Sequence, residues 1–138
     1  MSIPAAAPRP YPPLGATAEK FLADNHLCTL TTVRADGSPH VAPVRFTWDA
    51  RAGVARVMTT VTRQKARNLL AASGGRAAVC QVAGMRWITL EGAATVSTDD
   101  ERLKEGIRRY TARYWSPPPQ PPGLAVIEIA VDHVMGLY

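Results

Sequence analysis

Short apolar and β-branched runs, separated by turn signals, dominate the pattern of hydrophobic and polar positions along the chain. The run 27–34 ends at Asp36-Gly37, a strong signal for a hairpin turn. A turn through 50–53 leads into the run 54–60, and consecutive strands with such tight turns form an antiparallel meander. The predicted strands are 27–34, 39–49, 54–60, 76–83, 86–97 and 124–131.

Apolar residues at helical spacing mark segments that flank the strands. Residues 17–25 predict a short helix with Phe21 and Leu22 facing the core. Thr98 and Glu101 form a capping box that opens a longer helix. The face of that helix expected to pack carries Leu103, Ile107, Tyr110 and Tyr114.

The number and kind of these elements predict the fold class and the domain boundaries. Six mainly antiparallel strands with a few helices fit a mainly-β fold, a six-stranded antiparallel split β-barrel, because closure removes exposed sheet edges. Pro39 and Pro43 favour an edge or bulged position for their strand. Residues 1–16 hold five of the twelve prolines and predict a flexible leader. Residues 17–138 then form one domain.

Composition changes this picture little, but it excludes several classes of protein. Contents of 46% hydrophobic and 20% charged residues fit a globular chain. No apolar run has the length of a membrane span, and the start of the chain lacks the layout of a signal peptide. Cys28 and Cys80 lie in apolar runs and show no metal-ligand spacing with the histidines. We therefore expect a cytoplasmic protein without a membrane segment or a metal.

The placement of charge is more informative than the net charge of +5. Between Arg45 and Arg86 there are seven Arg and one Lys against a single acid, Asp49. Such a cationic middle predicts an anionic small-molecule partner. Nucleic acid is the weaker choice, because the basic residues are scattered among strands and no nucleic-acid-binding motif occurs.

The stretch 57–72 joins the end of a strand to the start of a helix. Its first part, 57–60, is a short, β-branched run, which is typical of a strand end. Thr62 fits a helix N-cap, and 63–72 is rich in helix formers. The face of this helix expected to pack inward carries Ala66, Leu69 and Leu70.

Hydroxyls and cations meet at this junction. Thr59 and Thr60 end the strand, while Arg63 and Lys65 lie in the first helical turn. Strand-end hydroxyls, free backbone N–H groups and two cations together suit a bound phosphate. The alternative is an ordinary strand–helix connection with solvated basic residues.

No nucleophile–base pair, Gly-x-Ser-x-Gly motif or pair of catalytic carboxylates can be identified, which favours cofactor chemistry or binding. Trp87 lies on the mixed-polarity face of its strand, where a core residue and an interface or ligand-stacking residue are equally expected. Gln81 lies opposite the apolar face of its own strand and is either a ligand-contacting or a surface residue. Arg45 stands among apolar residues, and buried arginines usually have an anionic partner.

Five segments, taken in order, resemble one family. They are S-P-H-V-A-P-V-R-F-T-W-D (38–49), R-V-M-T-T (56–60), R-Q-K-A-R-N-L (63–69), Q-V (81–82) and R-W-I-T-L-E-G (86–92). Over residues 18–135 the chain resembles the pyridoxamine-phosphate-oxidase-like split β-barrel flavoproteins, which include FMN-binding proteins. Within them it is most similar to the branch that binds the deazaflavin coenzyme F420, and there to the F420-dependent biliverdin reductases of mycobacteria.

The resemblance implies a homodimer with two cofactor sites at the subunit interface. It places Val44, Arg45, Met58, Thr59 and Thr60 beside the cofactor ring and its chain, and Arg63 and Lys65 on the phosphate. Gln81 and Trp87 would come from the partner subunit. The implied reaction is hydride transfer from reduced coenzyme F420 to an organic acceptor, biliverdin in this branch, with Arg45 or Arg86 binding the acceptor carboxylates.

Two alternatives stay open. FMN also carries a ring, a ribityl chain and a phosphate, so an FMN-dependent oxidoreductase of the same fold is one alternative. The additional carboxylates of the deazaflavin coenzyme suit the basic middle of the chain and favour F420 weakly. A non-catalytic flavin- or deazaflavin-binding protein is the other alternative. Vitamin B6 oxidation is not expected, since the chain ends without the Trp- and Arg-rich tail of the pyridoxamine-phosphate oxidases.

Overall fold

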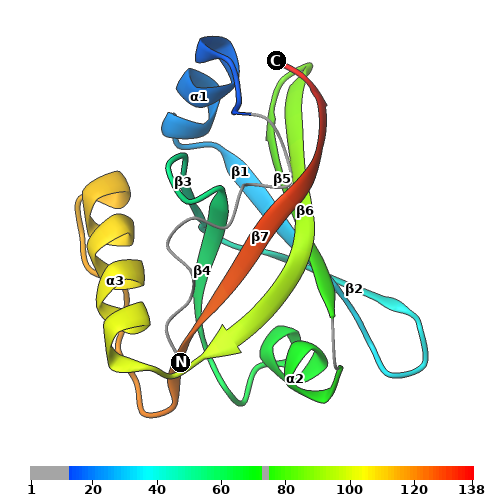
Figure 1. Cartoon of the computed structure of the whole chain (residues 1–138), viewed down its shortest axis with the longest axis vertical. Coiled ribbons are helices and arrows are strands. Elements are labelled where there is room, and N and C mark those ends of the chain that lie inside the picture. Colours follow the sequence, from blue (N-terminus) through cyan, green and yellow to red (C-terminus); the bar gives the residue numbers. More distant parts are fainter. Residues whose placement is uncertain (1–12, 73–74) are drawn as a thin grey trace.

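The computed structural model describes residues 13–72 and 75–138, which form an antiparallel seven-stranded sheet and three helices (Figure 1). The helices are α1 (Ala16–Ala23), α2 (Gln64–Ala71) and α3 (Asp100–Tyr114). The strands are β1 (Leu27–Val33), β2 (Pro39–Pro43), β3 (Thr47–Asp49), β4 (Val54–Thr60), β5 (Arg76–Ala83), β6 (Arg86–Ser97) and β7 (Leu124–Leu137). The predicted mainly-β, antiparallel fold class is confirmed.

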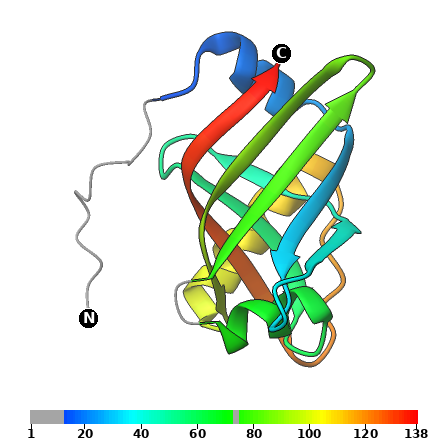
Figure 2. The ribbon, with the colours of Figure 1, turned by 90° about the vertical axis from the view of Figure 1, so that its right-hand side faces the viewer.

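The sheet curls on itself, because its two edge strands are joined by a connection too short to cross a flat sheet. The strand order is β2-β1-β5-β6-β7-β4-β3, and residues 44–46 connect β2 at one edge to β3 at the other. Figure 2 shows the strands wrapped around a common interior. The sequence predicted one strand over 39–49, which is wrong, because the pairing partner changes from β1 to β4 within this stretch. The edge position predicted from Pro39 and Pro43 is confirmed.

The last strand, β7, is longer than predicted. It continues from Leu124 to Leu137 and pairs with β4 and β6, whereas the apolar alternation predicted an end at residue 131. Asp132 interrupts that alternation, but it lies at a bulge opposite Glu91 and Gly92, beyond which pairing resumes. A bulge of this kind bends the strand and helps to close the curled sheet.

The core lies between the curled sheet and α1, which covers one end of it. Phe21 and Leu22 of α1 are buried, as predicted, together with side chains of every longer strand. Burying one such side chain stabilises the fold by about 1.5–3 kcal/mol. In Figure 1, α2 lies at the opposite end, and α3 runs along the outside of β3 and β4. No helix of the described residues is long and apolar enough to cross a membrane.

A buried ion-pair network fixes α3 to the sheet. Arg56 on β4 contacts Asp49 at 2.9 Å and Glu128 at 3.0 Å, and all three side chains are at most 10% exposed. Arg109 of α3 reaches the same Asp49 carboxylate at 3.0 Å, and Arg102 pairs with Glu128. These contacts determine where the face of α3 lies relative to β4.

Two further predictions meet the structure only in part. Asp99, and not Thr98, caps α3, because its carboxylate accepts a hydrogen bond from the Arg102 N–H at 3.2 Å. The predicted leader, 1–16, lies mostly outside the described residues. Its last residue, Ala16, already belongs to α1, and Leu14 packs against the core.

Candidate functional site

The junction between β4 and α2 differs in detail from its prediction. Arg63, and not Thr62, occupies the N-cap position of α2, and no side chain caps the helix there. The Thr62 hydroxyl instead lies 3.1 Å from that of Thr60, and the Arg63 N–H donates to the Thr60 carbonyl at 3.2 Å. The first N–H groups of α2 therefore have no side-chain acceptor and are available to a ligand.

The inward face of α2 also shifts by a residue. Ala66 and Leu69 are buried as predicted, but Leu70 is 56% exposed. Asn68 takes the buried place, and its amide donates to the Thr32 hydroxyl at 2.9 Å. This polar contact holds α2 against β1.

Beside this junction lies a cavity of about 320 Å³ between the end of β4, the start of α2 and the last turns of α3. Six of the nine residues that the sequence assigned to a cofactor line it together. The lining consists of Arg45, Met58, Thr59, Thr60, Arg63, Lys65, Tyr110, Pro118, Pro119, Pro121 and Leu124.

The lining of this cavity is cationic and contains no carboxylate. Burial, and then the charge of nearby Arg63, lower the pKa of Lys65. Arg45, Arg63 and Lys65 take part in none of the ion pairs formed among residues 13–72 and 75–138. A bound anion would relieve this repulsion, so the cavity favours a negatively charged ligand.

One hydroxyl of the lining lacks a partner. Thr59 is 8% exposed, and its Oγ1 makes no hydrogen bond in the structure. A buried hydroxyl without a partner is costly, and a ligand with acceptor oxygens removes that cost. The two cations, the uncapped helix start and this hydroxyl together fit a phosphate with a polar chain attached.

Three predicted site residues lie elsewhere. Val44 is half-buried and packs against the core next to Arg45. Gln81 is 0% exposed; its amide nitrogen donates to the Phe21 carbonyl at 2.6 Å, and its oxygen accepts from Arg113 at 2.9 Å. Gln81 lies on the face of β5 that points into the core. The structure therefore does not support a contact between Gln81 and a cofactor.

Arg86 and Trp87 are the first two residues of β6 and lie outside the cavity lining. Trp87 is half-buried on the outer face, and the exposed Arg86 places its guanidinium carbon 4.4 Å from the centre of the Phe21 ring. Direct cross-strand pairing aligns Trp87 with other outward apolar side chains across four strands. This apolar row consists of Leu27, Val82, Trp87 and Leu137.

The sequence did not identify two components of the cavity. Tyr110 was assigned only to the packing face of its helix, yet its hydroxyl accepts a hydrogen bond from Arg45 at 3.0 Å. Pro118, Pro119 and Pro121 form an apolar wall. The run of prolines indicated a stiff connector, but nothing local indicated which surface it covers.

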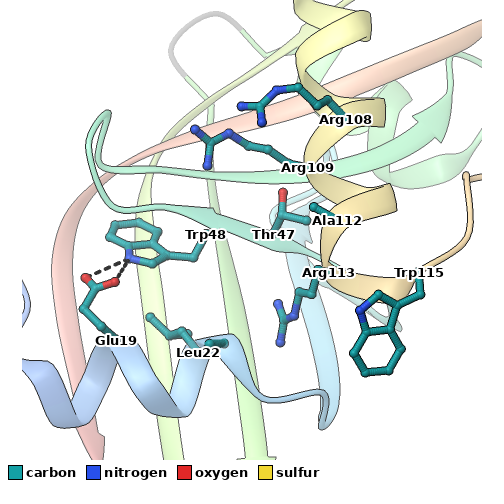
Figure 3. Close-up of a pocket in the computed structure, with 10 residues that line it drawn as sticks. Glu19, Leu22, Thr47, Trp48, Arg108, Arg109, Ala112, Arg113 and Trp115 are labelled. Atoms are coloured by element: carbon teal, nitrogen blue, oxygen red, sulfur yellow. Dashed lines mark hydrogen bonds between the residues drawn. The ribbon is translucent and has the colours of Figure 1, made fainter.

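A second cavity, of about 420 Å³, lies between α1, β3 and α3 (Figure 3). Two of its three arginines are in ion pairs: Arg108 pairs with Glu105 at 2.7 Å, and Arg109 pairs with Asp49 at 3.0 Å. The Glu19 carboxylate accepts from the indole N–H of Trp48 at 3.0 Å (Figure 3). The larger volume therefore offers less unneutralised charge, and the cavity at β4 and α2 is the better candidate.

Known proteins resemble this chain over most of its length. The family model described as pyridoxamine 5'-phosphate oxidase matches residues 14–138. An F420H(2)-dependent biliverdin reductase of Mycobacterium tuberculosis (strain CDC 1551 / Oshkosh) is 45% identical over 123 residues, which cover 89% of this chain and 88% of that protein.

Solved structures show the same fold. A structure named F420 reductase superposes with a TM-score of 0.65 at 26% identity, over 85% of this chain and 94% of its own. A conserved hypothetical protein of Mycobacterium tuberculosis superposes with a TM-score of 0.73 at 20% identity, over 89% and 84% of the two chains.

Proposed function

This chain belongs to the pyridoxamine 5'-phosphate oxidase family, and we propose that it catalyses a cofactor-dependent reduction. The chain is an oxidoreductase that uses coenzyme F420, and its acceptor is a small conjugated anion, biliverdin. The observation that carries this proposal is the cation pair Arg63 and Lys65, unneutralised beside the hydroxyls at the end of β4.

Each residue of the cavity has a role in binding or orientation. Arg63 and Lys65 hold the coenzyme phosphate, since charge-assisted hydrogen bonds at a helix start are strong ones. The residues beside the ring and its chain are Arg45, Met58, Thr59 and Thr60, which line the cavity, and the half-buried Val44, which directly precedes Arg45 but lies outside the lining. Reduced coenzyme F420, when bound, supplies the hydride.

The chain contributes orientation and selection of the acceptor. Arg45 binds an acceptor carboxylate and so holds the acceptor against the ring, and orientation of this kind lowers the barrier. The prolines of the wall exclude water from one side. We assign the proton to solvent or to a water molecule held by an arginine of the cavity. Arg86 lies outside this cavity, and any role toward the acceptor would require a second copy of the chain.

We further propose a homodimer. Leu27, Val82 and Leu137 of the apolar row are 84%, 44% and 61% exposed on a continuous outward face. Contiguous exposed apolar surface typically marks an interaction site. A second copy covering this row would bring Trp87 to the interface. We place the enzyme in the cytoplasm, where reducing conditions suit its two unbridged cysteines.

The absorbance spectrum and a fluorescence titration of the purified protein test the proposal. We expect a protein without bound flavin that binds F420 and, when supplied with reduced F420 and biliverdin, oxidises the coenzyme as bilirubin forms. Co-purified FMN with no binding of F420 would overturn the choice of cofactor. Tight binding of F420 without turnover of any acceptor would instead make the chain a carrier.

A further inference from the structure

The guanidinium of Arg45 is exposed, yet two tyrosines of α3 hold it. Its Nη1 donates to the Tyr110 hydroxyl at 3.0 Å. Its Cζ lies 5.1 Å from the centre of the Tyr114 ring and 6.0 Å from that of Tyr110. An arginine on aromatic rings gains cation–π attraction and loses freedom to rotate.

The tyrosines themselves are fixed. Tyr114 donates its hydroxyl to the Phe46 carbonyl at 2.7 Å, and burial raises the pKa of Tyr114, so this donor keeps its proton. The two tyrosine rings contact each other, with centres 4.9 Å apart. Phe46 directly follows Arg45, so the same short segment supplies both the arginine and the anchor of its platform.

Arg45 keeps most of its hydrogen-bonding capacity. A guanidinium has five N–H donors, and the structure gives Arg45 one hydrogen bond, to a neutral hydroxyl. By contrast, Arg56 and Arg109 in the network beneath α3 both contact the Asp49 carboxylate. Arg45 is therefore a held cation whose charge is not neutralised by the described residues.

We propose that Tyr110 and Tyr114 are positioning residues that orient Arg45 to bind one carboxylate of the acceptor, so that the enzyme selects conjugated acceptors with free carboxylate side chains over their esters. This inference rests on the proposed function. Arg45 and Tyr110 line the cavity from the side of α3, while Arg63 and Lys65 line it from the start of α2. The phosphate of the coenzyme and the carboxylate of the acceptor thus use different cations, and the apolar proline wall lies along the same cavity.

The experiment compares biliverdin with its dimethyl ester in the wild-type protein and in Tyr110→Phe. The variant keeps the ring and loses the hydroxyl that Arg45 contacts. We expect the KM for biliverdin to rise about threefold to tenfold, as for loss of one hydrogen bond that orients a charged group. The KM for the ester, kcat and the affinity for F420 should stay within about twofold.

Arg45→Ala completes the test. It should abolish the preference for the acid over the ester, and Tyr110→Phe should add nothing in its presence, because the hydroxyl acts through Arg45. Equal acid-to-ester ratios in the wild type and in Tyr110→Phe would overturn the inference, as would a wild type without preference for the acid.

A titration of the cofactor-free protein with biliverdin, followed by absorbance, separates this inference from the proposed function. Tighter binding of the acid than of the ester, lost in Arg45→Ala, supports the inference even if F420 does not bind. Tight F420 binding with turnover but no acid preference would leave the proposed function standing and defeat the inference alone.

Discussion

Burial, and then the charge of Arg63, lower the pKa of Lys65, and no carboxylate lines the cavity that the two cations share. Ion pairs elsewhere in the described chain bring opposite charges together, as Arg56 and Asp49 do at 2.9 Å. Two like charges that line one cavity, the exposed Arg63 and the half-buried Lys65, indicate a site that a ligand completes. The first two predictions follow from this pair.

Lys65→Ala should weaken F420 binding. A hydrogen bond to a charged group contributes about 1.5–3 kcal/mol, and about 1.4 kcal/mol corresponds to a factor of ten, so we expect a loss of about tenfold to a hundredfold. The free energy of unfolding of the cofactor-free protein should change little, since removal of one cation relieves repulsion. A fluorescence titration and urea denaturation measure the two quantities.

Arg67→Ala is the matched control for this variant. Arg67 is exposed on the same helix and donates to the Gln64 side chain at 2.6 Å, without lining the cavity. It should cost less affinity than Lys65→Ala. Equal affinities of the wild type and Lys65→Ala would rule out the assignment of the phosphate to this pair.

The affinity for F420 should fall as the pH rises through the lowered pKa of Lys65. The pKa of Lys65 is lowered in the free protein, and a bound phosphate raises it again, so binding takes up a proton where Lys65 is partly deprotonated. Affinity is then complete below the lowered pKa and decreases as the pH rises through it. Titrations at increasing pH should show this slope in the wild type and a flatter one in Lys65→Arg, since arginine stays charged. Identical slopes would show that another group is responsible.

Val82→Asp should convert the proposed homodimer to monomers. The substitution places a charge in the apolar row, between Leu27 and Trp87 in the cross-strand pairing. Sedimentation velocity measures the change, with Leu70→Asp as the control at an exposed leucine of α2. A wild-type monomer that binds F420 tightly would contradict the proposal, as would equal effects of the two substitutions.

Arg56→Met should destabilise the fold strongly. Removing Arg56 takes the shared partner from the buried carboxylates of Asp49 and Glu128, which keep Arg109 and Arg102 as partners, and we expect a loss toward the lower end of the about 3–5 kcal/mol that breaking a buried pair costs. Arg76→Met, which removes the exposed pair with Asp132, should cost about 0–1 kcal/mol. Urea denaturation compares the two variants, and similar losses would mean that burial of the network contributes nothing.

Local sequence features predicted the elements of the fold well where the deciding interactions are local. The Asp36-Gly37 turn is an example, because the positive φ of 87° at Gly37 is a property that glycine brings with it. The position of Arg63 and Lys65 beside the end of β4 is another example, because α2 follows β4 after only three residues. The break within 39–49 was missed because it depends on which strands pair across the whole sheet.

The parts of the site that the sequence did not predict come from distant contacts. Arg45 meets Tyr110 from 65 positions away, and both tyrosines fit a packing face equally well. The burial of Gln81 was not predicted for a related reason. Strand alternation places it opposite the outer residues of β5, but only the curled sheet shows that this face is the interior.

The three-residue connection from β2 to β3 links closure of the sheet to the shape of the cavity. Arg45 lies in that connection, and the Val44 N–H closes the β1 side by donating to the Cys28 carbonyl at 3.0 Å. A transient opening between the two edge strands would carry Arg45 away from α3 and enlarge the cavity. A ligand that contacts both Arg45 and α2 should therefore stabilise the closed arrangement of the two edge strands. On ligand binding, amide hydrogen exchange should slow more in the connection 44–46 than in the central strands.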